Sequence, residues 1–232
     1  MRKTLLIIFM FSTFAASAQE NIIKLNFSSL LLGNIGLQYE ANLNLHSSLC
    51  IGISYLPSSH LPKFIRDEDS TKNLESLTFS GWSFTPEYRY YVSGKAPTGF
   101  YLAPYFRYST YTIDEIILTY SSTATGLEIA VPAYGTFKGT TVGLMVGAQW
   151  SLSEHLSLDW WILGAGFGSQ KAELTALGYF SPTDVQDIKN ELADIDVTGD
   201  LQYNVNSNSV NISYDPETPG IRGFGICLGY KF

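Results

Sequence analysis

The last thirteen residues, 220–232, carry an alternating pattern that limits what this chain can fold into. One parity of the segment is small or polar. The other parity is apolar or aromatic throughout and consists of Phe224, Ile226, Leu228, Tyr230 and Phe232. Because successive side chains of a strand point to opposite faces, the pattern predicts a strand with one wholly apolar face. Antiparallel sheets of soluble proteins also contain such strands, so this segment alone leaves a secreted β-sandwich and a closed barrel open.

The first eighteen residues have the layout of an export signal. Arg2 and Lys3 form a basic start, a mostly apolar stretch follows, and Ala16-Ser17-Ala18 supplies small residues for cleavage. The apolar stretch is too short for a membrane helix, and no later stretch reaches the length that such a helix needs. We therefore expect a signal peptide at residues 1–18 and a single mature domain at residues 19–232.

The expected mature chain is strongly acidic. It keeps 12 of the 14 basic residues and all 21 acidic residues, so its net charge is −9. Nucleic acid is excluded as a partner class, since phosphate binding needs basic patches. The 15 tyrosines and 14 phenylalanines are typical of chains whose rings lie at a membrane interface. Cys50 and Cys227 fall on strands that we do not expect to be neighbours, which predicts two buried free thiols.

Segments with period-two alternation recur along the mature chain. They span residues 22–31, 35–45, 49–55, 81–91, 100–111, 140–152, 156–167 and 220–232. The connections after the second, fourth and sixth segments are short, whereas those after the third, fifth and seventh are long. Transmembrane barrels alternate in this way, with short periplasmic turns and longer outer loops, and a closed sheet satisfies every backbone polar group in lipid. The sequence therefore predicts an all-β, eight-stranded antiparallel up-and-down transmembrane β-barrel with long extracellular loops.

Two stretches add detail to this prediction. Pro86 and Pro104 fall inside predicted strands, where a proline cannot donate to the ladder, so we expect a bulge or a missing bond beside them. Residues 112–138 contain two apolar runs around a Ser-Ser-Thr turn. We expect these runs to form a hairpin that extends the fifth and sixth strands beyond the membrane.

Several stretches of the chain resemble a known family. They are residues 23–33 (IKLNFSSLLLG), 37–40 (LQYE), 86–91 (PEYRYY) and 99–108 (GFYLAPYFRY). The family is an uncharacterised one, a domain of unknown function, whose members are small outer-membrane β-barrel proteins similar in architecture to the OmpA and OmpX barrels. The closing strand with Tyr230 and the terminal Phe232 resembles the assembly signal of such barrels. The resemblance implies a location in the cell outer membrane, with lipid and the barrel assembly machinery as partners, and implies no activity.

Charged residues on the inward parity are the first candidate site. They are Lys24, Glu40, Glu87, Arg89, Arg107 and Asp159, three of each sign. A barrel of eight strands is just wide enough to be filled by side chains, so we expect a neutral charge network in a packed lumen, with ion pairs between Arg107 and the neighbouring strand. A narrow polar pore is the alternative, although selective pores usually carry rings of one charge sign.

Catalytic chemistry has little support in the sequence. A Ser/His/acid site needs a histidine beside a nucleophile. His46 and His155 fall in predicted short turns, and His60 is the one histidine in a long loop, near Ser58 and Asp67. No glycine-rich phosphate loop and no zinc-binding spacing of cysteine and histidine occurs. We therefore expect no enzyme.

The long connection 169–219 is the second candidate site. It carries nine acidic and two basic residues, a net charge of −7. Ser181-Pro182-Thr183-Asp184 has the cap, the proline and the acid of a helix start, which predicts a short helix to about residue 193. The acids that follow it, Asp194, Asp196 and Asp200, resemble the first half of a calcium loop. The bidentate glutamate of such a loop is missing, so a solvated acidic loop is the default interpretation. Residues 201–214 are expected to form a further hairpin.

These observations lead to one functional hypothesis and two alternatives. The hypothesis is a non-enzymatic outer-membrane β-barrel with a packed lumen and acidic surface loops, which has a structural role or recognises an extracellular ligand. The first alternative is a narrow outer-membrane channel. The second is a soluble exported barrel that binds an apolar ligand, which requires the apolar parity to face inward. No cofactor is expected apart from the candidate calcium ion.

Overall fold

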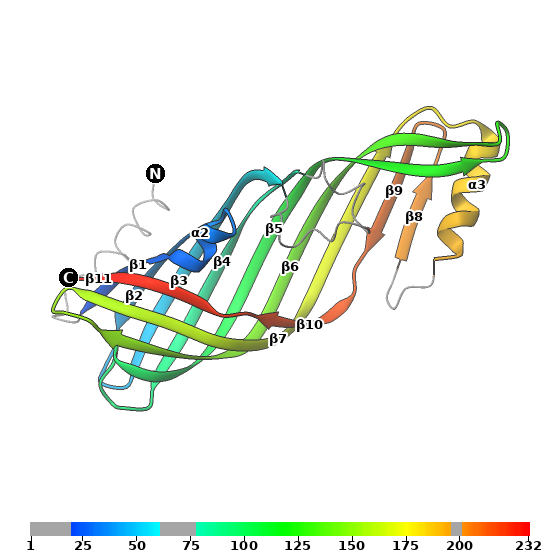
Figure 1. The fold of residues 1–232 in the computed structure, drawn as a ribbon. Helices are drawn as coiled ribbons and strands as arrows, with labels where there is room; N and C mark the ends of the chain where they lie inside the picture. The colour runs from blue at the N-terminus through cyan, green and yellow to red at the C-terminus, as the bar shows by residue number, and fades with distance from the viewer. Residues whose placement is uncertain (1–19, 61–77, 196–200) are drawn as a thin grey trace, which may run out of the picture.

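The computed structural model describes residues 20–60, 78–195 and 201–232 of the chain (Figure 1). These residues form one antiparallel sheet of eleven strands, together with two short helices. The all-β prediction is confirmed. The expected signal peptide at residues 1–18 lies outside the described residues and stays a prediction.

The elements follow one another in the order shown in Figure 1. The first group of strands is β1 (Asn21–Asn26), β2 (Ile35–Asn42), β3 (Ser47–His60) and β4 (Thr78–Tyr91). Three long strands follow: β5 (Gly99–Ser122), β6 (Leu127–Ser151) and β7 (Leu156–Leu177). The last group is β8 (Leu201–Val205), β9 (Ser209–Tyr214), β10 (Glu217–Arg222) and β11 (Gly225–Lys231). The helices are α2 (Phe27–Leu31) and α3 (Pro182–Ala193).

The pairing of the strands closes on itself. Neighbours pair in the order β11-β1-β2-β3-β4-β5-β6-β7, and β11 also pairs with β7. We call this closed part the ring. Backbone bonds between Asn21 and Phe232 continue the β1–β11 pairing to the end of the chain, at 3.0 and 3.1 Å.

The prediction of eight strands is wrong, because the connection 169–219 adds further strands to the sheet. It contributes β8, β9 and β10, of which β9 and β10 pair with β7. In addition, β5, β6 and β7 have 24, 25 and 22 residues, about twice the length of the segments predicted there. Their outer halves leave the ring and form a second body with β8, β9 and α3, which we call the extension (residues 112–136, 171–195 and 201–214; Figure 1). The predicted hairpin of β5 and β6, the helix and the hairpin of β8 and β9 are all confirmed within it.

The first predicted strand is wrong in its outer half. The chain leaves the sheet after Asn26 and forms the single-turn helix α2. The Asn26 side chain accepts a hydrogen bond from the Ser29 backbone N–H at 3.1 Å, which caps the helix start and competes with continued pairing. At the two prolines, the β4–β5 ladder has gaps at both Pro86 and Pro104 while its register stays constant, so the missing bond is the observed solution.

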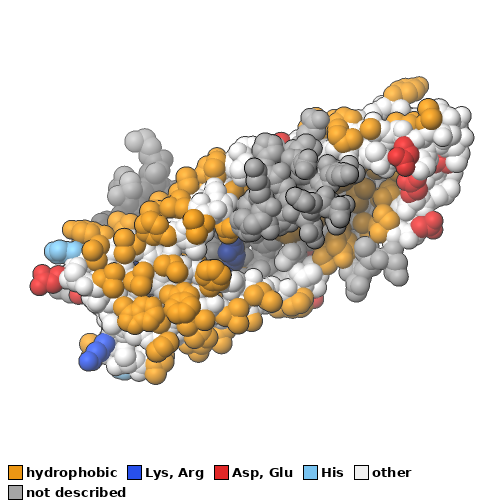
Figure 2. All heavy atoms as spheres, viewed as in Figure 1, with side chains coloured by type: hydrophobic (Ala, Val, Ile, Leu, Met, Phe, Trp, Pro, Cys, Tyr) orange, Lys and Arg blue, Asp and Glu red, His pale blue; other side chains and the backbone are white. Residues whose placement is uncertain are grey.

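The two faces of the ring differ in chemistry. Large apolar side chains on the outside are exposed and include Ile23, Leu37, Ile53, Phe84, Phe100, Val142, Trp160 and Leu228. Figure 2 shows these apolar side chains over the end of the molecule that the ring forms. The inside holds the buried charges together with a cluster of Tyr91, Tyr101, Ala103, Tyr105, Met145, Trp161 and Cys227. Neither described helix is long and apolar enough to cross a bilayer.

The extension has a core of its own. Its buried residues are Tyr120, Val131, Ala133, Ala176, Phe180, Ile188, Leu192, Val205 and Val210. They come from the outer halves of β5, β6 and β7, from β8 and β9, from one face of α3 and, in the case of Phe180, from the connection between β7 and α3. This cluster explains why strands of more than 20 residues stay ordered beyond the ring, since a hairpin without a packed face is only marginally stable.

Candidate functional site

A cluster of charged side chains fills the inside of the ring at the end that holds the C-terminus. Lys24, Glu40, Glu87, Arg89 and Asp159 are each at most 1% exposed. Register places them together: Glu40 pairs with Cys50, which pairs with Glu87 on the next strand. These side chains share one parity of the strands and therefore one face of the sheet.

The cluster is a continuous network of ion pairs. Lys24 Nζ lies 2.5 Å from Glu40 Oε2 and 2.6 Å from Asp159 Oδ2. The Arg89 guanidinium lies 2.8 Å from Glu87 Oε2 and 2.6 Å from Asp159 Oδ2, and 3.4 Å from Glu40 Oε2. Each carboxylate thus faces two cations, because Glu87 also accepts from Arg222 at 2.6 Å. We call this set of six residues the charge network.

Five of the six residues predicted for the lumen network meet in it, and the expected pairing of Arg107 is wrong. Arg107 is half-buried and forms no ion pair with another described residue. Arg222 of β10, and not Arg107, is the additional arginine that pairs with Glu87. Arg222 has the same parity as the outward-facing Phe224 and Ile226, so an unbroken strand would place it on the outside. The change of face occurs at residues 223 and 224, which separate β10 from β11 and are both exposed.

Uncharged side chains complete the network. The Tyr91 hydroxyl donates to Glu40 at 2.6 Å, and the Tyr101 hydroxyl donates to Asp159 at 2.8 Å. The Gln149 side-chain oxygen accepts from Lys24 Nζ at 2.5 Å. Sequence reasoning did not assign these three residues to the network, although their inward parity was a usable signal. Together the side chains leave no network charge unpaired, which is the condition for burying charge at all.

Glycines on the inward face make room for the large rings. A Cβ on Gly143 would lie 2.6 Å from the Tyr105 ring, and a Cβ on Gly225 would lie 2.0 Å from the Trp161 ring. Real Cβ atoms do not approach so closely, so any other residue at these positions would displace a ring. Gly143 of β6 and Gly225 of β11 therefore leave the space that two aromatic side chains occupy inside the ring.

A cavity of about 950 Å³ lies on the other side of the network, inside the half of the ring that faces the extension. Its polar and charged walls include Asn34, Arg107, Thr141, Gln170 and Arg222. Its aromatic walls include Tyr105, Phe137 and Trp161. The lumen is therefore divided into a filled part and an open part.

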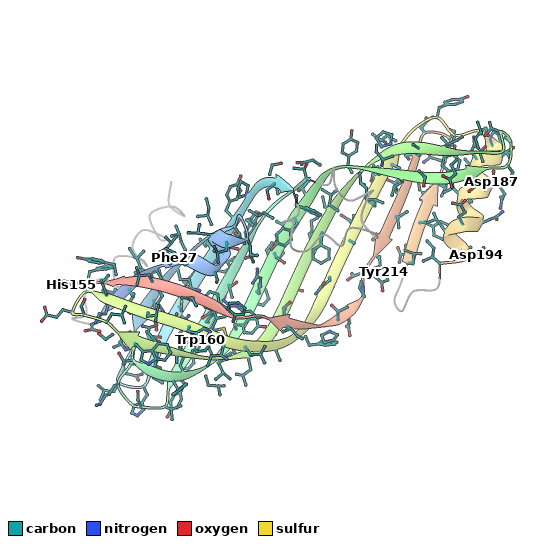
Figure 3. The ribbon with its side chains drawn as sticks, viewed as in Figure 1. Phe27, His155, Trp160, Asp187, Asp194 and Tyr214 are labelled. Carbon is teal, nitrogen blue, oxygen red and sulfur yellow. The ribbon has the colours of Figure 1, made fainter. Side chains whose placement is uncertain are left out.

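Acidic residues of α3 fasten the helix to the tip of the β5–β6 hairpin. Ser122 Oγ donates to Asp184 at 2.6 Å, and the Thr123 backbone N–H donates to Asp187 at 2.9 Å (Figure 3). The hydrogen bonds from Ser122 and Ser181 lower the pKa of Asp184 below its usual value of 3.8. The default of a solvated acidic loop is thus wrong for these acids, which act as anchors.

The remaining predicted residues lie apart from this site. Asp194 is exposed at the end of α3 (Figure 3), and the other two calcium candidates, Asp196 and Asp200, lie outside the described residues, so calcium binding stays a prediction. No group of three or more potential metal ligands occurs among the described residues. Tyr230 and Phe232 are exposed on the outside of the ring, at 55% and 59%.

The cysteines and histidines complete the account. Cys50 and Cys227 are buried free thiols on β3 and β11, which are not neighbours. His46 and His155 stack on Tyr90 and Tyr230 at the turn end of the ring. The side chain of His60 lies outside the described residues, and the expectation of no enzyme stays a prediction.

Comparison with known proteins gives one match. No curated protein and no solved structure matches the chain. The sequence model of a family described as "Protein of unknown function (DUF3575)" matches residues 4–191, well over half of the chain. The chain therefore belongs to this family, in agreement with its resemblance to a domain of unknown function.

Proposed function

We propose that this chain is a non-enzymatic protein of the cell outer membrane, whose ring spans the bilayer as a β-barrel with a sealed lumen. The observation that carries the proposal is the inverted distribution of side chains in the ring. Five charged residues inside are at most 1% exposed, whereas Leu37, Phe100 and Val142 outside are 52%, 61% and 64% exposed.

Contact between water and so many exposed apolar side chains is unfavourable. Soluble monomers rarely expose a contiguous apolar patch of more than a few hundred Å², whereas here the apolar side chains come from every strand of the ring. Burial of apolar surface in lipid contributes about 25 cal/mol per Å². Closure of the strand pairing supports the same proposal, because backbone polar groups without partners are too costly in hydrocarbon.

The outer-membrane orientation follows from the lengths of the connections. The short turns after β2, β4 and β6 lie at the end of the ring near the C-terminus, and the extension lies at the opposite end (Figure 1). In barrels of this kind the short turns face the periplasm and the long segments face outward. The extension would then project from the cell as the recognition surface, with an extracellular ligand as its partner.

The charge network supports a sealed lumen over the channel alternative. Lys24, Arg89 and the three carboxylates fill the cross-section with paired groups that are at most 1% exposed, and the network is neutral rather than of one sign. The alternative of a lumen that binds an apolar ligand needs the apolar parity inside, and that parity is outside.

Protease treatment of intact cells tests this proposal. The chain is expressed with its own export segment in a Gram-negative host, and proteinase K is added before and after the outer membrane is opened. We expect the protein in the outer-membrane fraction, with the extension cut in intact cells and the ring protected. Recovery of the chain in the soluble periplasmic fraction would contradict the proposal. Conductance of the purified protein in planar bilayers separates the sealed barrel, which gives no steps, from the channel.

A further inference from the structure

We propose that the cavity inside the ring binds a small organic anion, a molecule with a carboxylate or phosphate group on an apolar or aromatic body. The site consists of Arg107, Arg222, Tyr105 and Trp161. It lies inside the ring and shares no residue with the extension, so it goes beyond the recognition surface proposed above. The proposed location in the outer membrane matters only for the side from which the anion arrives.

The charge of the cavity is the first argument. The charged residues among its described walls are two arginines, and no described carboxylate lines it. The charge network is neutral once Arg222 is counted with Lys24 and Arg89, since three carboxylates oppose them. Arg107 is therefore a cation of the lumen that no carboxylate of the described residues neutralises, in a chain whose net charge is −7. A guanidinium without a carboxylate partner among the described residues is suited to pair with a carboxylate or phosphate of a ligand.

The free donors of the cavity are the second and independent argument. Tyr105 is 96% buried, since 4% of its surface is exposed, and its hydroxyl forms no hydrogen bond with a described residue. Because Tyr105 lines the cavity, its hydroxyl can donate to a molecule bound there. Trp161, another wall residue, is 6% exposed, and its indole N–H also has no hydrogen-bond partner among the described residues. The free groups of both side chains can donate, which an anion with several oxygen atoms can satisfy.

The way Arg222 is held supports the same ligand. Glu87 binds one end of its guanidinium at 2.6 Å, and the group lies 4.7 Å from the Trp161 ring and 5.4 Å from the Tyr105 ring. Its side chain is 10% exposed. The arginine is thus fixed in place before any ligand arrives, which lowers the entropy that binding costs.

The size and walls of the cavity define the rest of the ligand. A volume of about 950 Å³ is at the upper end of the range for small-molecule sites. The rings of Tyr105, Phe137 and Trp161 offer apolar surface beside the arginines. A bare inorganic ion would leave most of this space unfilled, whereas an anion with an aromatic body would contact both kinds of wall.

Calorimetric titration of the refolded full chain in a non-ionic detergent at low salt tests the proposal. The probes are phenyl phosphate and benzoate, with neutral benzyl alcohol and cationic benzylamine as matched controls. We expect at least one of the two anions to bind, and the tighter one assigns the class as phosphate or carboxylate. Neither control should bind with comparable affinity. Absence of binding by both anions, or equal binding of benzylamine, would overturn the proposal.

Variants separate a site from a general effect of charge. Arg107→Gln should weaken binding of the anion about tenfold or more, since a charge-assisted hydrogen bond is lost. It should leave the fold intact because Arg107 forms no ion pair with any residue that the structure describes. Lys95→Gln removes the same charge from an exposed turn at the other end of the ring and should leave affinity unchanged. Equal weakening by both substitutions, or none by either, would refute the assignment.

A fluorescence measurement tests the cavity without changing either arginine. Iodide and caesium quench tryptophan fluorescence and differ in charge. The part of the emission that Trp161→Phe removes should be quenched more strongly by iodide than by caesium, because two guanidinium groups face the cavity. Equal quenching by the two ions would contradict the positive character of the cavity.

Discussion

Replacement of Arg89 by methionine should be the most damaging single change inside the ring. Arg89 is fully buried, pairs with Glu40, Glu87 and Asp159, and lies 4.6 Å from the Tyr101 ring. Methionine has a similar length but no charge, so the network would keep three carboxylates against two cations. Removal of one partner from a buried ion pair costs about 3–5 kcal/mol. We expect the lower end, about 3 kcal/mol, because every carboxylate keeps a second cation, either Lys24 or Arg222.

Urea unfolding of the protein in lipid vesicles measures this loss. With a slope of about 1–3 kcal/mol per M, the midpoint should fall by about 1 M or more. Arg107→Met is the matched control, since it removes the same side chain from the same lumen without breaking an ion pair, and its effect should stay within about 0.5 kcal/mol. If the two variants unfold at the same urea concentration, the ion pairs of Arg89 do not stabilise the ring.

A compensating change sharpens the test. Asp159→Asn added to Arg89→Met restores neutrality and leaves two pairs, Lys24 with Glu40 and Arg222 with Glu87. The double variant should be more stable than the sum of the single effects by about 0.5–3 kcal/mol, the usual coupling of residues in one network. Additive effects would show that the two charges do not act through each other.

Three further predictions concern other parts of the fold. Gly225→Ala should destabilise the ring by about 1–3 kcal/mol through the 2.0 Å approach of its Cβ to an indole ring, whereas Gly52→Ala, with 3.5 Å to the nearest atom, should be nearly neutral in the same urea assay. The folded-state pKa of Asp184 lies below its usual value of 3.8, so its contribution to the extension is present above that pH and is lost as the pH falls below it. Protection of the α3 amides, relative to their intrinsic exchange rate at each pH, should therefore fall below about pH 4, and Asp184→Asn should remove this pH dependence. Phe232→Ala should lower the amount of assembled protein in the outer membrane several-fold, and Phe100→Ala, an equally exposed ring, should not.

The parity of the strands was the most informative property of the sequence. It assigned Lys24, Glu40 and Asp159 to one face, and the structure brings them together because register between neighbouring strands keeps that face common to all. Parity cannot foresee where a strand changes face. The interruption of the strand at residues 223 and 224 places Arg222 on the inside. No local pattern in this glycine-rich segment predicts the interruption.

The extension could be predicted only in pieces. The capping residues Ser181 and Asp184 predicted α3, and the turn residues 206–208 predicted the hairpin of β8 and β9. Their assembly depends on long-range contacts, such as Ser122 with Asp184 across 62 positions of the chain. A pattern within one segment carries no information about such a partner, so the acids of α3 looked like solvated charges.

The cavity was beyond prediction for a related reason. Arg107 was placed on the inward face correctly, but the expected partner of a buried arginine is a carboxylate. The carboxylate on the neighbouring strand, Glu87, is already held by Arg89 and Arg222. Only the three-dimensional distribution of charges shows that the network is complete without Arg107.

Electrophoresis of the outer-membrane fraction in SDS, with and without boiling, tests the central claim most directly. Closed barrels resist the detergent until they are heated, because every backbone group is paired within the ring. The account predicts a membrane-associated band that migrates differently before and after boiling. A protein that is released as soluble and migrates identically under both conditions would contradict the claim that the ring lies in a membrane.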